Sequence, residues 1–423
     1  MRLLPTKADL VESFATPKTD LIAGLTVAIV ALPLALAFGI ASGLGATSGI
    51  VTAVLAGAIA AIFGGSRYQV SGPTGAMTVV LLPIVHQFGT DAVLAVGLMA
   101  GLLLTLAAAL KLGDHVHRIP TAIIEGFTAG IAVVIALQQI PTALGVKVGS
   151  SDHVWQLAWD ALARLSHANW ASIWLALGCA TLILLGERLL PRVPFALVAV
   201  AAAMLVTLVA QLEVRQIGTL PALLASPKAD FMASTNWVAL APSALAVATL
   251  AALESLLSAK VADRLAGAKV GHDSNRELFG QGLANLVVPF FGGVPATAAL
   301  ARTAVNVRNH SHSRLSALSH AIFLALFVLL APWLVAKIPL AALAGVLFAT
   351  TARMVKPSEL KALAKESRLD ALLLATTFVL TIALDLISAV MVGLLLFIAL
   401  RNSKLSAVDR RYPPVDKKET LGD

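Results

Sequence analysis

Apolar stretches of about twenty residues, separated by short polar segments, follow one another from Leu21 to Leu400. A helix needs roughly 20 apolar residues to cross the hydrocarbon core of a bilayer, and fewer when neighbouring helices shield it. The pattern therefore predicts twelve spanning helices, with a turn at Asp385 between the last two. They are predicted at 21–40, 48–64, 92–110, 119–141, 169–186, 193–211, 240–259, 279–291, 315–335, 339–352, 369–384 and 386–400.

Two further apolar segments, 71–85 and 296–307, are too short to be complete spans. The first begins with a glycine- and proline-containing sequence at 68–75, and the second begins with another at 292–297. Such interruptions in both halves of a chain are typical of transporters built from inverted repeats. A helix that begins inside the membrane leaves backbone N–H groups unpaired, and its positive dipole end favours an anion. The alternative is that glycine and proline only kink two spanning helices.

The composition supports a membrane protein. Of the 423 residues, 58% are hydrophobic and 13% are charged, about half the roughly 25% of charged residues in soluble domains. The single cysteine, Cys179, excludes an internal disulfide framework. His310 and His312 lie close together without a third metal ligand nearby. No Walker loop, HExxH sequence or nucleophile elbow is present, so we expect no enzyme activity, no cofactor and no metal.

The net charge of +8 is explained by topology, so we expect no nucleic-acid partner. With fourteen segments both termini lie on one side, and the loops and tails of that side carry 25 Lys and Arg, against 5 on the other. The positive-inside rule then places both termini in the cytoplasm of a multi-pass inner (plasma) membrane protein. We expect a cytoplasmic segment at 1–20 and a cytoplasmic tail at 402–423.

Two charged residues lie well inside apolar segments, away from their ends: Arg302 in 296–307 and Glu254 in 240–259. Intramembrane charges are costly and mark functional sites. We expect these opposite charges to meet. They either form a locked ion pair that joins two helices, or Arg302 attracts the anion while Glu254 accepts a proton during loading.

Several motifs occur in an order that resembles the sulfate permease (SulP) family of anion transporters. The resemblance covers nearly the whole chain and is carried by residues 20–39, 71–75, 254–258, 272–282, 292–297 and 301–306. It implies an all-α, uracil-permease-like membrane fold of about fourteen segments. Two inverted seven-segment repeats, at 21–211 and 240–401 with an extracellular connection at 212–239, would form a core and a gate domain. Many members are dimers, so a homodimer is one implied assembly. Most members also carry a C-terminal STAS domain, which we do not expect in this sequence.

The resemblance also implies roles for individual residues. Glu254 lies where sodium-coupled bicarbonate relatives carry a sodium-binding aspartate, and proton-coupled relatives carry glutamate there. Ser258 keeps a hydroxyl where the sodium-dependent relatives have threonine, so sodium coupling stays open. The residues implied to line the anion site are Phe38, Thr74, Gly75, Ala76, Leu300, Ala301 and Arg302.

The sequence thus predicts a secondary active transporter of small inorganic or carboxylate anions (sulfate, bicarbonate or dicarboxylate) across the lipid bilayer. The favoured mechanism is anion:proton symport with an elevator-like motion. Sodium-coupled bicarbonate symport and anion exchange are alternatives within this class. An uncoupled anion channel and a non-transporting receptor are alternatives of another class.

Overall fold

The computed structural model of the chain describes residues 3–118, 120–149, 154–190, 193–219, 226–233, 235–268, 270–383 and 386–400. Every one of the fourteen predicted segments contains a helix. These helices are α2 (Pro17–Ala41), α3 (Ala46–Phe63), α4 (Gly75–Phe88), α5 (Thr90–Ala109), α6 (Thr121–Leu144), α8 (Trp170–Leu189), α9 (Phe195–Val209), α10 (Trp237–Ala266), α11 (Ser274–Val287), α12 (Leu300–Arg308), α13 (Arg314–Leu330), α15 (Leu340–Met354), α17 (Arg368–Ala383) and α18 (Leu386–Leu400). The predicted turn at Asp385 and the predicted tail at 402–423 lie outside the described residues.

Several short helices do not follow from the search for apolar runs. Helices α1 and α16 carry several charges and so lack the uniform hydrophobicity of a span, whereas α14 and η4 are apolar and fall at the ends of the predicted spans 315–335 and 279–291. The additional elements are α1 (Lys7–Ser13), α7 (Val154–Ala163), α14 (Pro332–Ala336) and α16 (Pro357–Glu366), with the 3₁₀ turns η1 (Leu112–Arg118), η2 (Leu165–His167), η3 (Asp230–Met232) and η4 (Val288–Phe291).

The described residues contain seven helical segments that are long and apolar enough to cross a membrane. The protein is therefore a helical, multi-pass membrane protein. One feature differs from the all-α expectation. Strand β1 (Ser71–Gly72) pairs antiparallel with β2 (Thr297–Ala298), with Ser71 opposite Ala298 and Gly72 opposite Thr297. The glycine- and proline-containing sequences before the two short segments thus form a small sheet.

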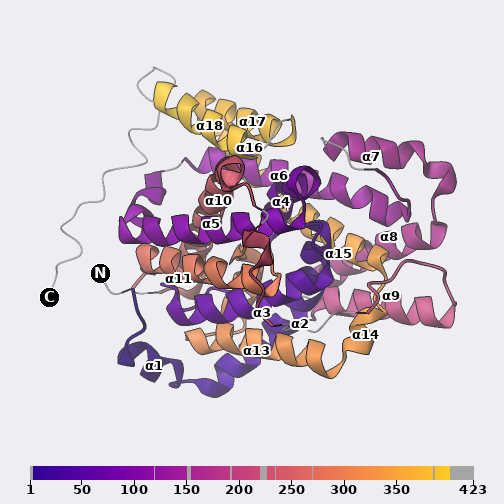
Figure 1. Ribbon diagram of the computed structural model, residues 1–423, viewed down its shortest axis with the longest axis horizontal. Helices are drawn as coiled ribbons and strands as arrows, with labels where there is room; N and C mark the ends of the chain where they lie inside the picture. The colour runs from indigo at the N-terminus through magenta and orange to yellow at the C-terminus, as the bar shows by residue number, and fades with distance from the viewer. Residues whose placement is uncertain are drawn as a thin grey trace. The chain divides into compact units, whose positions relative to one another are not determined.

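By packing, the chain divides into two compact units, Met1–Asp114 with Val134–Ala352 (unit 1) and His115–Val133 with Arg353–Asp423 (unit 2). In unit 1, α13 packs against α2 and α3, and α11 packs against α3 and α5 (Figure 1). The helices approach closely at small residues. A Cβ on Gly101 of α5 would come within 2.7 Å of the Leu286 nitrogen on α11.

In unit 2, α17 packs against both α16 and α18 (Figure 1). Its core contains Ile123, Leu369, Leu373 and Phe397. This division reflects packing, whereas the predicted repeats at 21–211 and 240–401 concern symmetry, and those repeats stay a prediction.

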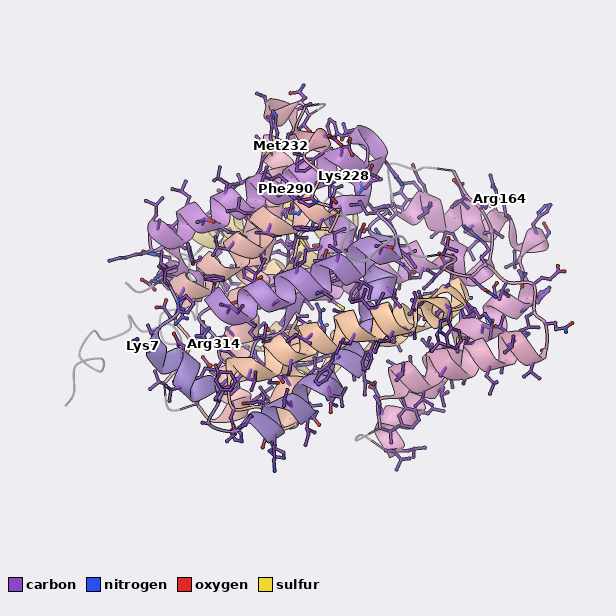
Figure 2. The ribbon with its side chains drawn as sticks, turned by 60° about the horizontal axis from the view of Figure 1, so that its bottom comes forward. Lys7, Arg164, Lys228, Met232, Phe290 and Arg314 are labelled. Atoms are coloured by element: carbon purple, nitrogen blue, oxygen red, sulfur yellow. The ribbon has the colours of Figure 1, made fainter. Side chains whose placement is uncertain are left out.

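The predicted connection at 212–239 lies against other parts of unit 1 where it is described. The backbone nitrogen of Lys228 donates a 2.7 Å hydrogen bond to the carbonyl of Phe290 (Figure 2). The rings of Phe231 and Phe290 lie with their centroids 5.6 Å apart. Gln216 forms an antiparallel bridge with Pro339. The connection is thus anchored to η4 and to the residues before α15.

Candidate functional site

The two-stranded sheet is the starting point of both short helices. Pro73 and Thr74 lead from β1 into α4, and Ala299 leads from β2 into α12. Because the strands are antiparallel, the chain leaves the sheet at one end toward α4 and at the other end toward α12. Two interrupted segments, separated by more than two hundred residues, thus begin their helices at one place in unit 1.

Both helix starts keep backbone N–H groups that side chains do not cap. In α4, the Thr74 hydroxyl caps only the nitrogen of Met77, at 3.4 Å. In α12, the N-cap residue Ala299 makes no side-chain capping bond. The first N–H groups of a helix have no partner within the helix and carry its positive dipole end. The arrangement therefore favours an anion near the sheet.

Arg302, in the first turn of α12, adds a full positive charge to this region. Only 1% of the residue is exposed. Its Nη2 donates a 2.7 Å hydrogen bond to the backbone carbonyl of Pro73, and its Nη1 has no partner among the described residues. One nitrogen therefore fixes the guanidinium beside the start of α4, while the other keeps a free hydrogen-bonding capacity.

Glu254 lies on α10 and is partly buried. Its Oε2 accepts a 2.9 Å hydrogen bond from the Thr74 hydroxyl. The predicted direct contact with Arg302 is wrong: the ion pairs within 4.0 Å in the described part of the chain include none between these two residues. Arg302 instead contacts the carbonyl of Pro73 and Glu254 the hydroxyl of Thr74, so consecutive residues at the start of α4 link the two charged side chains.

The remaining residues predicted to line the anion site divide into buried and exposed positions. Phe38 on α2 is 6% exposed, and its Cε1 lies 3.2 Å from where a Cβ on Gly75 would stand. Ala76 is also buried. Leu300 is 47% exposed and Ala301 is exposed, so the first turn of α12 presents these side chains to open space and Arg302 to the interior.

Ser258 lies one turn along α10 from Glu254, but its hydroxyl is directed elsewhere. Ser258 Oγ donates a 3.4 Å hydrogen bond to Thr303 Oγ1, and the Val70 nitrogen donates to the same oxygen at 3.1 Å. In this structure Ser258 therefore supports the contact between α12 and the residue before β1.

Ser255 on α10 and Gln69, two residues before β1, were given no role by the sequence analysis, and their hydrogen bonds attach α10 to the sheet region. Ser255 Oγ lies 3.0 Å from Thr297 Oγ1 and accepts a 3.2 Å hydrogen bond from the nitrogen of Ala298. The backbone carbonyl of Ser255 accepts a 2.7 Å bond from Gln69 Nε2. The sequence signal that could have indicated this role of Ser255 is its position directly after Glu254 in an otherwise apolar helix.

Two buried amides on α11 fix the sheet from another side. Asn285 exchanges two hydrogen bonds with the backbone of Ala296, at 2.7 and 2.9 Å. Gln281, one turn earlier, donates a 2.7 Å bond to Ser71 Oγ. The sequence signal for this pair is its spacing: two amide side chains four residues apart lie on the same face of a helix.

A metal site finds no support in the described ranges, where no group of three or more His, Cys, Asp or Glu side chains is placed to hold an ion. His310 is exposed. The backbone nitrogen of His312 donates a 2.7 Å hydrogen bond to Asp20 Oδ1. This loop therefore serves to attach α13 to α2.

Comparison with known proteins gives a consistent result. Residues 18–377 match the family described as "Sulfate permease family". YvdB of Bacillus subtilis (strain 168), whose name assigns it to sulfate transport, is 38% identical over 411 residues, which are 95% of this chain and 77% of that protein. The bicarbonate transporter BicA of Picosynechococcus sp. is 32% identical over 424 residues, or 97% of this chain and 74% of BicA.

Solved structures show the same fold. The transmembrane domain of a cyanobacterial BicA superimposes with a TM-score of 0.81 at 33% identity, covering 89% of this chain and 98% of that domain. Murine Slc26a9, in an inward-facing state, superimposes with a TM-score of 0.83 at 17% identity, covering 90% of this chain and 68% of that one. At that identity the second similarity concerns the fold alone.

Proposed function

The chain belongs to the sulfate permease family, and we propose that it is a secondary active transporter that carries a small anion across the membrane. The family consists of permeases and not of enzymes. The site lies in unit 1, where α4 and α12 begin at the β1–β2 sheet. The observation that carries the proposal is the buried Arg302, fixed to Pro73 beside two helix starts that favour negative charge.

Sulfate and bicarbonate are the first substrates to consider. The names of YvdB and BicA concern sulfate and bicarbonate respectively. Backbone N–H groups and one guanidinium recognise negative charge and oxygen acceptors, which sulfate, bicarbonate and a dicarboxylate all offer. Phe38, Thr74, Gly75, Ala76, Leu300, Ala301 and Arg302 are the proposed lining residues.

Proton coupling is the favoured mechanism, with Glu254 as the coupling residue. Glu254 is joined to the start of α4 through the Thr74 hydroxyl. When ionised it places a negative charge beside the positive helix start and disfavours a second anion, whereas a proton removes that charge. By linkage, anion binding must then favour proton binding to the same degree. Anion and proton would therefore load together.

Transport requires the loaded site to be exposed to each side of the membrane in turn. We propose an elevator-like motion in which a core domain containing the site moves against a gate domain. The proposed origin of these domains is two inverted repeats, and the antiparallel pairing of β1 and β2, which precede α4 and α12, is consistent with such symmetry. Cytoplasmic termini and a homodimer are further parts of this proposal.

Sodium coupling is the second candidate, favoured by the oxygen atoms around Glu254. The Thr74 hydroxyl contacts the carboxylate, and Ser258 lies one turn along the same helix. Carboxylate and hydroxyl oxygens are ligands suited to a hard cation. In this alternative, sodium would take the place of the proton at Glu254.

One experiment separates these functions. Purified protein in liposomes is tested for uptake of labelled sulfate, bicarbonate, fumarate and chloride under an imposed pH gradient, with and without sodium. Proton symport predicts saturable, concentrative uptake of an anion that follows the pH gradient without sodium. Uptake that depends on sodium or on an internal anion supports sodium symport or exchange. Uptake that neither saturates nor concentrates would indicate a channel, and no uptake of any anion would contradict the proposal.

A further inference from the structure

Three apolar side chains in and beside the short helix α1 are exposed. The apolar side chains of Leu4, Val11 and Phe14, in and beside the helix, are 63%, 74% and 63% exposed. A helix on a soluble surface directs such residues to the core and its charges to water. Here these three apolar side chains are exposed instead.

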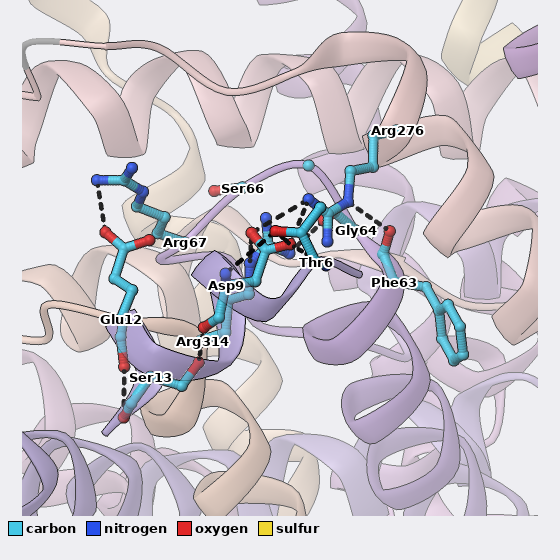
Figure 3. Close-up of polar contacts among 12 residues, drawn as sticks. Thr6, Asp9, Glu12, Ser13, Phe63, Gly64, Ser66, Arg67, Arg276 and Arg314 are labelled. Carbon is cyan, nitrogen blue, oxygen red and sulfur yellow. Dashed lines mark hydrogen bonds and ion pairs between the residues drawn. The ribbon is translucent and has the colours of Figure 1, made fainter. Parts of the chain in front are cut away.

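The acidic side chains of α1 point toward the protein instead. Asp9 pairs with Arg276 at 3.0 Å and lies 3.8 Å from Arg314, and Glu12 pairs with Arg67 at 2.8 Å (Figure 3). The helix start is fixed by a capping box between Thr6 and Asp9. The charges therefore hold α1 in one orientation, and this orientation is what exposes Val11 and Phe14.

The partners of Asp9 are themselves tied to the end of α3. Arg276 Nε donates a 3.4 Å hydrogen bond to the carbonyl of Phe63, and Arg314 Nη1 donates to the carbonyl of Gly64 (Figure 3). Arg276 lies at the start of α11 and Arg314 at the start of α13. Since α1 is attached to the ends of three long helices, its position is defined by the body of unit 1.

The exposed apolar surface of α1 continues into α2. Phe14, Ala15 and Thr16 are the only residues between the two helices. In the first turns of α2, the apolar residues Leu21, Ile22 and Leu25 are 41%, 64% and 36% exposed. Asp20 in the same turn is fully buried and accepts hydrogen bonds from the nitrogens of His312 and Ser313.

A phospholipid surface is the occupant that this continuity favours. Helix α2 is long and apolar enough to span a membrane, so its exposed apolar side faces acyl chains. Because α1 immediately precedes that span, it lies at the level where acyl chains give way to headgroups. Apolar side chains with nearby lysines are typical of helices that lie in this interface. Lys7 and Lys18 are both exposed and fit the phosphates of lipid headgroups.

We propose that α1 is an interfacial membrane anchor, in which Leu4, Val11 and Phe14 enter the boundary between headgroups and acyl chains while Asp9 and Glu12 bind the helix to unit 1. The occupant of the apolar surface is phospholipid. Cover by a second copy of the chain or by another protein segment is the competing outcome of the test.

The single cysteine of the chain makes a direct test practical. Cys179 is buried, and its replacement by alanine provides a cysteine-free background. Val11→Cys and Phe14→Cys are introduced separately and labelled with an environment-sensitive fluorophore. Arg264→Cys is the matched control, because Arg264 is an exposed, charged residue in the last turn of a long helix. All three positions are exposed, so the substitutions leave the packed interior unchanged.

Each labelled protein is reconstituted into liposomes with and without lipids brominated on the acyl chains. The proposal predicts blue-shifted emission at positions 11 and 14 and several-fold stronger quenching by brominated lipid than at position 264. Equal quenching at all three positions would overturn it. Blue-shifted emission at 11 and 14 that brominated lipid does not quench would also overturn it, because protein would then cover this surface. Fluorescence and its quenching do not depend on anion transport, so this experiment tests the membrane anchor separately from the proposed function.

A second measurement covers the case in which labelling disturbs α1. Hydrogen–deuterium exchange of the unlabelled, wild-type chain is followed in liposomes of neutral lipid and of lipid with added phosphatidylglycerol. Stronger protection of residues 7–13 in the anionic liposomes supports the contact of Lys7 and Lys18 with headgroups. Protection that is lower in liposomes than in detergent would contradict membrane contact altogether.

Discussion

The Arg302 guanidinium donates a hydrogen bond to the backbone carbonyl of Pro73, 2.7 Å away. The next residue, Thr74, donates its hydroxyl to Glu254. Two consecutive residues at the start of α4 thus contact the two charged side chains. A direct ion pair would neutralise the positive charge, whereas this arrangement keeps it available to an anion and still couples it to Glu254 through α4.

Replacing Arg302 by alanine is expected to weaken anion binding. A hydrogen bond to a charged group contributes about 1.5–3 kcal/mol, which corresponds to a roughly ten- to hundredfold rise in Kd. Binding of the transported anion is measured by radioligand competition on purified protein. Arg308→Ala at the exposed end of α12 serves as the control and is expected to bind normally. Normal affinity in Arg302→Ala would remove Arg302 from the site.

Replacing Glu254 by glutamine is expected to abolish proton-driven accumulation while leaving exchange of anions across the membrane intact. Glutamine keeps an oxygen that can accept from Thr74 but cannot gain or lose a proton. Accumulation and exchange are measured in the same liposomes. Glu213→Gln, an exposed carboxyl outside the site, is the matched control. Full proton-driven accumulation by Glu254→Gln would exclude Glu254 as the coupling residue.

The Thr74 hydroxyl caps α4 and donates a hydrogen bond to Glu254. Two variants of Thr74 distinguish the effect of this hydroxyl from the effect of side-chain size. Thr74→Val removes both the cap of α4 and the hydrogen bond to Glu254, whereas Thr74→Ser keeps the hydroxyl. Loss of a cap costs about 1 kcal/mol. We therefore expect lower thermal stability and an altered pH dependence of uptake in Thr74→Val, with values near wild type in Thr74→Ser. Thr249→Val, which removes an exposed hydroxyl from α10, controls for the loss of a hydroxyl alone. Identical behaviour of Val and Ser at position 74 would show that the hydroxyl is unimportant.

Gly72 in β1 leaves space that the guanidinium requires. It has a φ of +152°, and a Cβ at this position would lie 2.5 Å from Arg302 Nη1. Gly72→Ala is expected to displace the guanidinium and reduce anion affinity in the same direction as Arg302→Ala. Gly178→Ala, where a Cβ would meet nothing within 4 Å, is expected to bind normally in the same assay. Wild-type affinity in Gly72→Ala would show that the guanidinium tolerates displacement.

The pKa of Asp9 determines how the attachment of α1 to unit 1 is expected to respond to pH. Burial raises the pKa of Asp9, but hydrogen bonds from Thr6 and the charges of Arg276 and Arg314 outweigh burial, so the pKa lies below its ordinary value of 3.8. The stabilisation is therefore fully present above that ordinary value and is lost only as the pH falls through the lowered one. We expect hydrogen–deuterium exchange in residues 7–13 to be unchanged from neutral pH down to about pH 5, after correction for the intrinsic rates.

Asp9→Asn removes the charge at every pH and is expected to increase that exchange already at neutral pH. Glu12→Gln is the comparison, because the Glu12–Arg67 pair is more exposed and an exposed pair contributes less. A larger effect of Glu12→Gln than of Asp9→Asn would contradict this account of how α1 is held.

The sequence was sufficient to locate the long helices and both interrupted segments, because spans of uniform hydrophobicity need no knowledge of their neighbours. It also indicated that Arg302 and Glu254 belong to one region. It did not reveal that Arg302 contacts Pro73 and Glu254 contacts Thr74, since that depends on the register in which Ser71 faces Ala298. Electrostatic attraction alone favoured a direct pair.

The supporting side chains were harder to predict for a related reason. Gln281 and Asn285 contact β1 and β2 through the packing of α11, which the linear sequence does not specify. Helix α1 was missed because it is short and partly charged, and the inward orientation of Asp9 becomes visible only when Arg276 and Arg314, far along the chain, are placed beside it.

The central claim is that the anion is bound where α4 and α12 begin, beside Arg302. The most direct measurement is an experimental density map of the protein at a saturating concentration of the anion that the liposome panel identifies. The account predicts density within hydrogen-bonding distance of Arg302 and of the first backbone nitrogens of α4 and α12. Density for the anion elsewhere, with these groups unoccupied, would contradict it.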